Sequence, residues 1–308
     1  KQRSKPQAQW STLSLQNPRA PNSDESGLAC FDLTQSGDHL ALASRKGNLE
    51  EVAADKSAMN LKILLTEIPR GNTARGVLQA IIGYLVNTGL TWHGKNILDI
   101  PCGQGDLIAT LRQFFPGARV LGCDVQAPQR ISPTDFALVD ASRSFNVFPP
   151  KKFDLVLLVS GVMEFDNTLK FFEQCKNHLN VGGMFLVSND NLMSVRDRLS
   201  FFWLGKFRQY HIFTQQPQPT RKVITTYNMI RILQDAGFTI KEVRYCSVRG
   251  KDYLMLPLAL LIYPVQWLYV QVAKHAMPVA LRHAMYPFSC LLYRHYFIVC
   301  EKPAGPAS

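Results

Sequence analysis

The sequence lacks paired cysteines, a cluster of metal-ligating side chains and an N-terminal apolar run. No two of its seven cysteines form a Cys-x-x-Cys pair, and their number is odd. These absences disfavour a disulfide framework, a zinc site or a redox motif, and they favour free thiols in a reducing compartment. The polar start at Lys1–Pro6 argues against a secretory signal. The residues give no metal site, which disfavours a metal-dependent catechol-type reaction.

Acidic residues are scarce relative to basic ones. The chain of 308 residues has 34 Lys and Arg against 23 Asp and Glu, a formal net charge of +11. The excess is concentrated between Leu192 and Lys251, where eleven basic residues stand against three acidic ones. An uneven basic stretch indicates an anionic partner such as acidic lipid, a phosphate-bearing substrate or nucleic acid, although a solvated basic surface would look the same.

Composition and the spacing of apolar residues divide the chain into four segments. Residues 1–45 are polar and lack periodicity, which predicts a flexible arm. Residues 46–94 form an N-terminal helical segment, with one helix predicted over Asn60–Leu90 and a stop at Gly89. Residues 95–302 make up the main domain, and residues 303–308 form a tail.

Within the main domain, short apolar runs alternate with helical stretches. The predicted strands are 96–100, 119–123, 136–139, 153–159, 183–188, 239–245 and 296–300, and the predicted helices are 106–115, 167–179 and 226–236. Such alternation implies parallel pairing with right-handed crossovers. The fold class is therefore α/β: a three-layer αβα, Rossmann-like, seven-stranded and mostly parallel sheet, with an antiparallel last strand and a helical insertion between strands six and seven.

The first of these strands runs into a glycine-rich loop, Ile97-Leu98-Asp99-Ile100-Pro101-Cys102-Gly103-Gln104-Gly105. Its glycines allow a ligand to approach the backbone, and the next helix presents free N–H groups. A Gly-x-Gly alone also occurs in ordinary tight turns. The third glycine of a dinucleotide-binding loop would fall at Ile108, so the loop disfavours a nicotinamide dinucleotide.

Two further carboxylates follow at strand ends. Asp124 ends the second strand, nineteen residues after Gly105, where an acid can accept hydrogen bonds from both hydroxyls of a ribose. Asp140 follows the third strand and can accept from an adenine amino group, with Ala141 and Ser142 offering nearby backbone. Asp140 alone would equally suit a turn cap.

Together these motifs resemble class I S-adenosylmethionine-dependent methyltransferases. The segment Phe153–Val156 resembles the start of the family's fourth strand, Ser160–Phe165 the segment that often reads His-Val-Leu-Glu-His, and Leu179–Gly183 the turn before the fifth strand. The resemblance implies S-adenosylmethionine as cofactor and a methyl transfer activity. It implies cofactor contacts at Asp99, Ile100, Pro101, Gly103, Gly105, Asp124, Val125, Asp140, Ala141, Ser160, Val162 and Met163.

Two positions depart from the family pattern. Pro101 replaces a more usual glycine, and Ser160 stands where the family often has His. A role of that His therefore cannot be transferred. If the acceptor must lose a proton, the candidate bases are His211 and Tyr210, in the acceptor-side insertion at residues 192–225, with His178 less favoured because it falls on a helical pattern.

Residues 254–293 form an apolar insertion where the family normally has a short turn. The stretch 254–273 has twenty residues without a charge, long enough to span a bilayer. Because the last strand must return beside the sixth, both ends of the insertion lie on one side, which excludes a single crossing. A second span is disfavoured by Arg282, so helices lying in the membrane interface are the better interpretation. The basic, aromatic segment Val195–Arg208 suits the same surface.

The sequence thus predicts methyl transfer, first of all to oxygen, onto a small-molecule or lipid-linked amphiphilic acceptor. It predicts a cytoplasmic protein, peripheral on the inner face of the membrane through residues 195–208 and 254–293. The arrangement resembles quinone-pathway and surface-glycan methyltransferases. A second copy of the chain, packing as a homodimer, is the alternative partner of the apolar segments. Alternative functions are methylation of RNA or protein, with nucleic acid disfavoured, and a non-catalytic cofactor-binding scaffold.

Overall fold

The computed structural model describes residues 65–71, 73–128, 130–143, 145–208, 222–272 and 277–304. The chain divides into two compact units, residues 1–51 and 52–308, and only the second contains described residues. The predicted arm at 1–45, the start of the helical segment and most of the tail lie outside the described residues.

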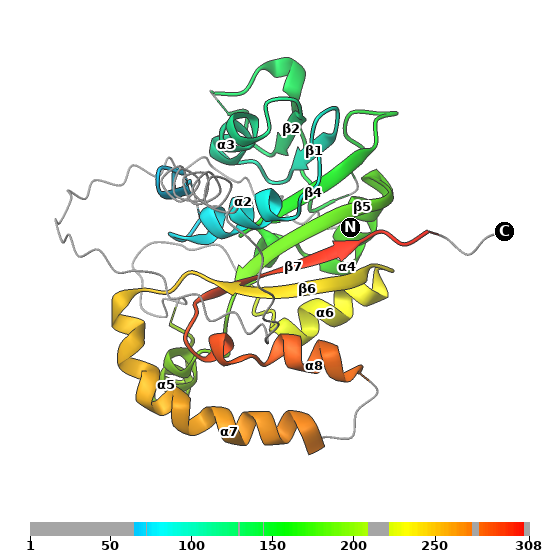
Figure 1. Ribbon diagram of the computed structural model, residues 1–308. Helices are drawn as coiled ribbons and strands as arrows, with labels where there is room; N and C mark the ends of the chain where they lie inside the picture. The colour runs from blue at the N-terminus through cyan, green and yellow to red at the C-terminus, as the bar shows by residue number, and fades with distance from the viewer. Residues whose placement is uncertain are drawn as a thin grey trace, which may run out of the picture. The chain divides into compact units, whose positions relative to one another are not determined.

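A seven-stranded sheet forms the centre of the second unit (Figure 1). The strand order is β3-β2-β1-β4-β5-β7-β6, with β7 antiparallel to both neighbours, as the sequence predicts. Apolar side chains on both faces of the central strands explain why the sheet is covered on both sides. The strands are β1 (Asn96–Asp99), β2 (Arg119–Asp124), β3 (Phe136–Leu138), β4 (Phe153–Val159), β5 (Leu179–Asp190), β6 (Thr239–Cys246) and β7 (His295–Glu301).

Helices cover the two faces of the sheet and complete three layers. Residues of α2 (Val77–Asn87) and α3 (Asp106–Phe114) pack into one core cluster, with Phe297 and Val299 of β7. The other face packs against α4 (Thr168–His178), α6 (Thr226–Asp235) and the end of α8 (Val279–Met285). The six cysteines that the structure describes are buried and free.

The insertion between β6 and β7 begins and ends at the carboxyl edge of the parallel strands. It contains the 3-10 helix η3 (Gly250–Met255), α7 (Leu256–Val272), α8 and the short η4 (Phe288–Leu291). A further helix, α5 (Val195–Leu204), follows β5 at the same edge and packs beside η3 and the first half of α7 (Figure 1). The prediction that both ends of the insertion lie on one side of the sheet is confirmed.

Two predictions about local structure are wrong. The predicted single helix 60–90 is interrupted, because residues 68–71 and 73–76, here called the strap, have no regular helical structure before α2 starts. Pro69 and two positive-φ glycines, Gly71 and Gly76, break the helical pattern. The fifth strand also starts earlier than predicted, at Leu179, and contains the expected turn residues within an irregularity of its register.

Candidate functional site

The glycine-rich loop joins the end of β1 to the start of α3. Gly105 takes φ +87°, and a Cβ at this position would come within 2.7 Å of Ile131 Cγ1. Only glycine fits there, since the conformation is left-handed and the space is filled. The loop therefore turns tightly and leaves the N-terminus of α3 facing the carboxyl edge of the sheet.

Asp124 ties the second strand to this loop. Its Oδ2 accepts a hydrogen bond from the Gly103 N–H at 2.8 Å, and its Oδ1 accepts from Gln126 N–H at 3.2 Å. Each carboxylate oxygen retains a further lone pair. The neighbouring Val125 is 60% exposed. Asp124 can therefore stabilise the loop and still accept bonds from a pair of hydroxyls.

Asp99 is buried at the end of β1, and its Oδ1 has no hydrogen-bond partner among the described residues. Burial, together with the nearby charge of Asp124, raises the pKa of Asp99 well above its usual value. A buried carboxylate without a partner is costly unless a donor or a cation compensates it. The loop thus has an acceptor that fits the ammonium end of an amino-acid cofactor.

Asp140 and Ala141 follow β3. Asp140 Oδ1 accepts from the Ser142 N–H at 3.1 Å, and Arg143 forms an ion pair with the same carboxylate at 3.2 Å. Asp140 thus caps its own turn, while Ala141 is buried beside it. The carboxylate remains exposed and able to accept a further donor.

Ser160 links β4 to the strap and to β5. Its backbone takes φ +59°, its N–H donates to Ser188 Oγ at 3.0 Å, and its Oγ lies 2.6 Å from Thr73 Oγ1 in the strap. Val162 and Met163 are buried immediately after it. A serine at this position therefore positions the strap over the carboxyl edge.

The strap crosses the edge from the cofactor loop towards β6. A Cβ on Gly71 would stand 3.5 Å from Asp106 at the start of α3, and Ser247 Oγ donates to Arg75 O at 2.7 Å just after β6. The predicted cofactor residues and the insertion are thus joined across one edge of the sheet.

A histidine–aspartate contact that no sequence motif signals lies at the same edge. His295 Nε2, at the start of β7, is 2.9 Å from Asp190 Oδ1, at the end of β5. His295 Nδ1 is buried and has no hydrogen-bond partner among the described residues. With the Nε2 proton donated to Asp190, the lone pair of a neutral ring resides on Nδ1. The contact with Asp190 fixes the orientation of the His295 ring at the carboxyl edge.

The predicted bases His211 and Tyr210 lie outside the described residues. His178, the less favoured candidate, has a structural role. Its Nδ1–H donates to Gln174 O at 2.8 Å, and its Nε2 accepts from Val147 N–H at 3.1 Å. Burial lowers the pKa of His178, and the hydrogen bond from Val147 N–H needs an unprotonated Nε2.

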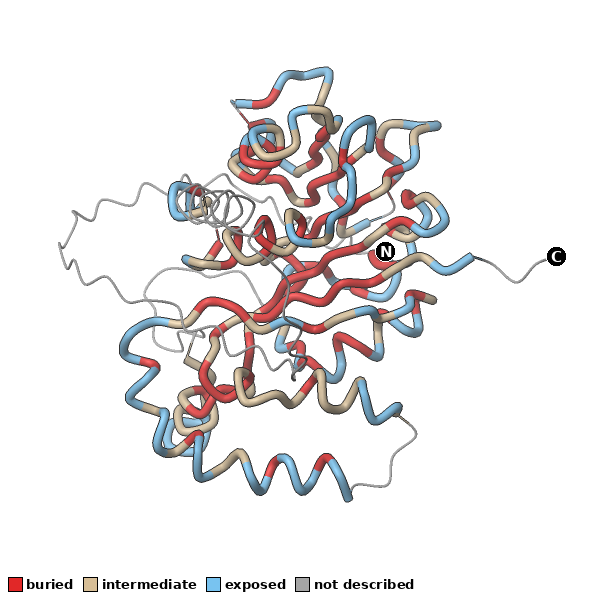
Figure 2. Tube along the Cα trace, in the orientation of Figure 1, coloured by how far each residue is buried: buried red, intermediate tan, exposed pale blue. Residues whose placement is uncertain are grey.

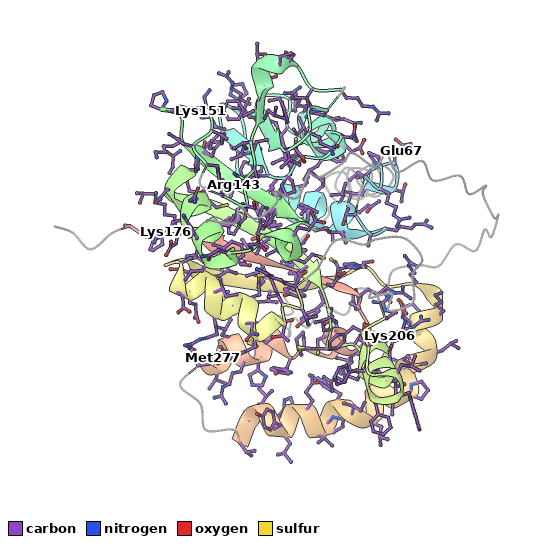
Figure 3. All side chains as sticks on the ribbon, turned by 180° about the vertical axis from the view of Figure 1, so that it is seen from behind. Glu67, Arg143, Lys151, Lys176, Lys206 and Met277 are labelled. Carbon is purple, nitrogen blue, oxygen red and sulfur yellow. The ribbon has the colours of Figure 1, made fainter. Side chains whose placement is uncertain are left out.

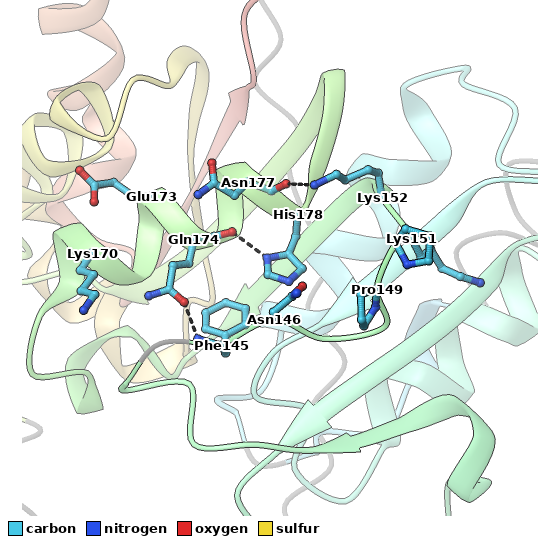
Figure 4. Close-up of a pocket in the computed structure, with 11 residues that line it drawn as sticks. Phe145, Asn146, Pro149, Lys151, Lys152, Lys170, Glu173, Gln174, Asn177 and His178 are labelled. Carbon is cyan, nitrogen blue, oxygen red and sulfur yellow. Dashed lines mark hydrogen bonds between the residues drawn. The ribbon is translucent and has the colours of Figure 1, made fainter.

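A cavity of about 570 Å³ adjoins His178 (Figure 4). It is lined by α4 and by the segment preceding β4, which places it at the amino edge of the sheet. Lys151, which lines the cavity, lies far from Lys206, which follows α5 (Figure 3). The cofactor loop is at the opposite edge, so this cavity is not part of the candidate site.

The residues brought together at the carboxyl edge fit the predicted cofactor. Asp99, Asp124 and Asp140 come from the ends of three successive strands in the sheet, next to a loop in which glycine allows close approach. The unpartnered Asp99 oxygen suits an ammonium, Asp124 suits ribose hydroxyls and Asp140 suits an amino group. These acceptors match the donors of a nucleoside-linked amino acid, and cofactor binding by these residues stays a prediction.

Comparison with known proteins agrees with this geometry. Residues 98–185 match the sequence family described as a methyltransferase domain. No curated protein matches the chain. Three solved structures resemble the chain at low identity and with TM-scores below 0.5. The first is a methyltransferase from Archaeoglobus fulgidus described as SAM-dependent (15% identity, 74% of this chain and 96% of that one, TM-score 0.46).

The second is coclaurine N-methyltransferase bound to N-methylheliamine and SAH (13% identity, 73% and 70%, TM-score 0.45). The third is the [4+2]-cyclase SpnF (17% identity, 73% and 81%, TM-score 0.45). At these values the structural likenesses carry no conclusion about the activity or the acceptor of this chain.

Proposed function

Since this chain is an S-adenosylmethionine-dependent methyltransferase, we propose that it methylates an amphiphilic, lipid-linked or lipid-like acceptor on oxygen, at a membrane surface. One observation carries the proposal: α5 and α7 expose large apolar side chains at the edge of the sheet that holds the predicted cofactor residues. Figure 2 shows exposed segments along both helices.

The apolar surface consists of large apolar side chains that are exposed to solvent in this structure. Phe202 is 75% exposed, Trp203 74% and Leu261 72%. Soluble monomers rarely expose apolar patches of this extent without a partner. The other members of the surface are Phe201, Leu204, Leu254, Leu260, Val265, Trp267, Leu268, Tyr269 and Val272.

The shape of the insertion favours lateral contact over crossing. The helical stretch Gly250–Val272 is long and apolar enough to span a bilayer, yet only 17% of its most apolar window is buried. Both of its flanks return to the carboxyl edge, so a single crossing would separate strands that pair. Its aromatic residues Trp267 and Tyr269 suit the headgroup level. Lys251 precedes α7, and α7 itself contains no acidic residue. An anionic bilayer complements this arrangement.

Chemistry at the edge requires positioning above all. The bound cofactor supplies an activated methyl group. The protein holds the acceptor oxygen in line, so that an oxygen–carbon bond forms as the carbon–sulfur bond breaks. The hydroxyl proton must then leave to a base. His295, oriented by Asp190, is the described group arranged to accept it, while His211 and Tyr210 remain predictions.

Vesicle flotation tests the membrane part of the proposal. We expect the full chain to float with vesicles of phosphatidylglycerol and phosphatidylcholine, and the double variant Leu261→Glu, Val265→Glu to stay in the bottom fraction. Val181→Glu is the control, because Val181 is 65% exposed near the start of β5, at the amino edge of the sheet and away from α7. Equal flotation of all three proteins would refute the proposal. Dimers of the wild type that the double variant loses, without flotation, would assign the surface to a second copy.

A further inference from the structure

We propose that an arginine cluster at the carboxyl edge binds a phosphate group of the acceptor. The cluster consists of Arg70 of the strap, Arg196 of α5, Arg208 after α5, Arg249 after β6 and Arg294 before β7. That the bound phosphate belongs to the methyl acceptor rests on the proposed function. The site itself rests on the geometry of these five side chains.

Asp252 fixes the inner part of the cluster. Arg294 binds Asp252 through Nε and Nη2, the latter at 2.6 Å, and Arg196 Nη1 binds it at 3.0 Å. The side chains of Asp252 and Arg294 are both nearly inaccessible. Two guanidinium groups thus share one buried carboxylate, which leaves this pairing with a net positive charge.

A second buried carboxylate holds Arg208. Asp197 accepts from the Arg208 N–H at 3.0 Å and from Nη2 at 3.3 Å. The Nε of Arg208 is buried and has no hydrogen-bond partner among the described residues. A buried N–H donor without an acceptor is costly, and an oxyanion would satisfy it.

The outer part of the cluster has no carboxylate of its own. Arg249 and Arg70 are exposed, and within the described residues neither makes an ion pair. Burial lowers the pKa of Arg249, the charges of Arg294, Arg70 and Arg208 lower it further, and Asp252 offsets only part of this effect. Mutual repulsion of this kind disfavours the cluster when it holds no anion, and a bound anion relieves it.

The cluster lies between the cofactor residues and the apolar surface. Arg70 Nε donates to Thr73 O at 2.9 Å, and Thr73 contacts Ser160 of the cofactor site. On the other side, Arg198 of α5 donates to Gln266 of α7 at 2.9 Å. A molecule with its apolar part against α7 would therefore bring a polar headgroup to the arginines.

The donor set favours phosphate. Guanidinium groups bind phosphate through paired, charge-assisted hydrogen bonds, and several of them here converge from four separate segments. A phosphate carries enough oxygen acceptors for Arg249, Arg70 and the free Nε of Arg208. The shared chemistry is a phosphate ester, either in a lipid headgroup or in a soluble molecule.

Calorimetry with inorganic pyrophosphate, on the full chain at low salt, tests the cluster directly. We expect Arg249→Gln and Arg70→Gln each to weaken binding by about tenfold or more. Arg119→Gln is the control, because Arg119 is exposed at the amino edge of β2. Binding of S-adenosylmethionine is measured for every variant, so that loss of the cofactor site is distinguished from loss of the phosphate site.

Equal pyrophosphate affinity in all four proteins, or no affinity in any, would overturn the proposal, whatever the cofactor result. A second arm compares flotation with phosphatidic acid and phosphatidylcholine vesicles. If Arg249→Gln loses the preference for phosphatidic acid, the phosphate belongs to a lipid headgroup. If only pyrophosphate binding changes, it belongs to a soluble or more elaborate phosphate ester.

Discussion

Asp99 is buried, its Oδ1 has no hydrogen-bond partner among the described residues, and the carboxylate of Asp124 lies nearby. We therefore expect its charge to lower the stability of the cofactor-free protein and to strengthen cofactor binding. Its pKa is raised in the folded protein without cofactor, mainly by burial and then by Asp124. An acid whose pKa is raised on folding loses stability as pH rises from about its unfolded value, 3.8, because the folded state holds the proton longer. The cost is present at neutral pH and is relieved when a cation binds.

We therefore expect Asp99→Asn to raise the free energy of unfolding of the cofactor-free protein at pH 7 and to weaken S-adenosylmethionine binding by tenfold or more, as expected for loss of a charged hydrogen-bond partner. Urea unfolding and calorimetry measure the two effects. Below about pH 4 the two proteins should have nearly equal stability. A variant that is less stable at pH 7 and binds the cofactor as well as the wild type would contradict this role.

His295 has the geometry of a base, and its replacement should separate chemistry from binding. We expect His295→Asn to lower kcat about 100-fold with an acceptor hydroxyl, a typical contribution of general-base catalysis, and to leave the dissociation constant of S-adenosylmethionine within twofold. Asp190→Asn should lower kcat less, because it only orients the ring. Steady-state kinetics measures kcat, and calorimetry measures the dissociation constant of S-adenosylmethionine. His283→Asn, on α8, serves as the control. Unchanged kcat in His295→Asn would remove His295 from the mechanism.

The pKa of His178 shifts in the opposite direction from that of Asp99, so its effect on stability appears at acidic pH. Its folded pKa is lowered, so the stability that it contributes is complete above its ordinary pKa of 6.5 and is lost as pH falls below that value. Replacing it by Gln should flatten the decline of unfolding free energy between pH 6.5 and 5, measured by urea unfolding. Methyl transfer at pH 8 should change little, since the residue lies at the amino edge. A large loss of activity there would contradict its structural role.

At the scale of elements, apolar runs were enough to predict the sheet. β4 reads Phe-Asp-Leu-Val-Leu-Leu-Val, and a run of this kind between turn signals indicates a strand buried on both faces. The cofactor loop was predictable because its residues are contiguous. The strap was not predictable, because the apolar residues on both sides of it have helical spacing. Only Pro69, Gly71 and Gly76 interrupt that pattern.

The Asp190–His295 pair could not be predicted because its partners are far apart in sequence. They become neighbours only through the antiparallel register of β5 and β7, which sets Asp190 opposite His295. The arginine cluster has the same origin, since four segments meet where the strands end. The basic stretch between Leu192 and Lys251 was a signal for it, but composition alone does not distinguish a cluster from a solvated surface.

For the molecule as a whole, we expect cofactor binding and folding to be coupled through Asp124, which joins the glycine-rich loop to β2. A ligand present at 100 times its dissociation constant stabilises the native state by about 2.7 kcal/mol. In a domain of this size that corresponds to a rise in Tm of roughly 5–10 °C. We expect S-adenosylmethionine to produce such a rise in the wild type, measured by differential scanning calorimetry.

Asp124→Ala should lose most of this rise, because the carboxylate that accepts from the ribose is gone. Its cofactor-free Tm should also fall by a few degrees, since the bond to Gly103 N–H is lost with it. Asp166→Ala is the matched control, because the side chain of Asp166 is almost fully exposed, and it should keep the whole rise. If Asp124→Ala shows the same rise as the wild type, the carboxyl edge of β1 and β2 does not bind the cofactor, and the site must be sought elsewhere on the sheet.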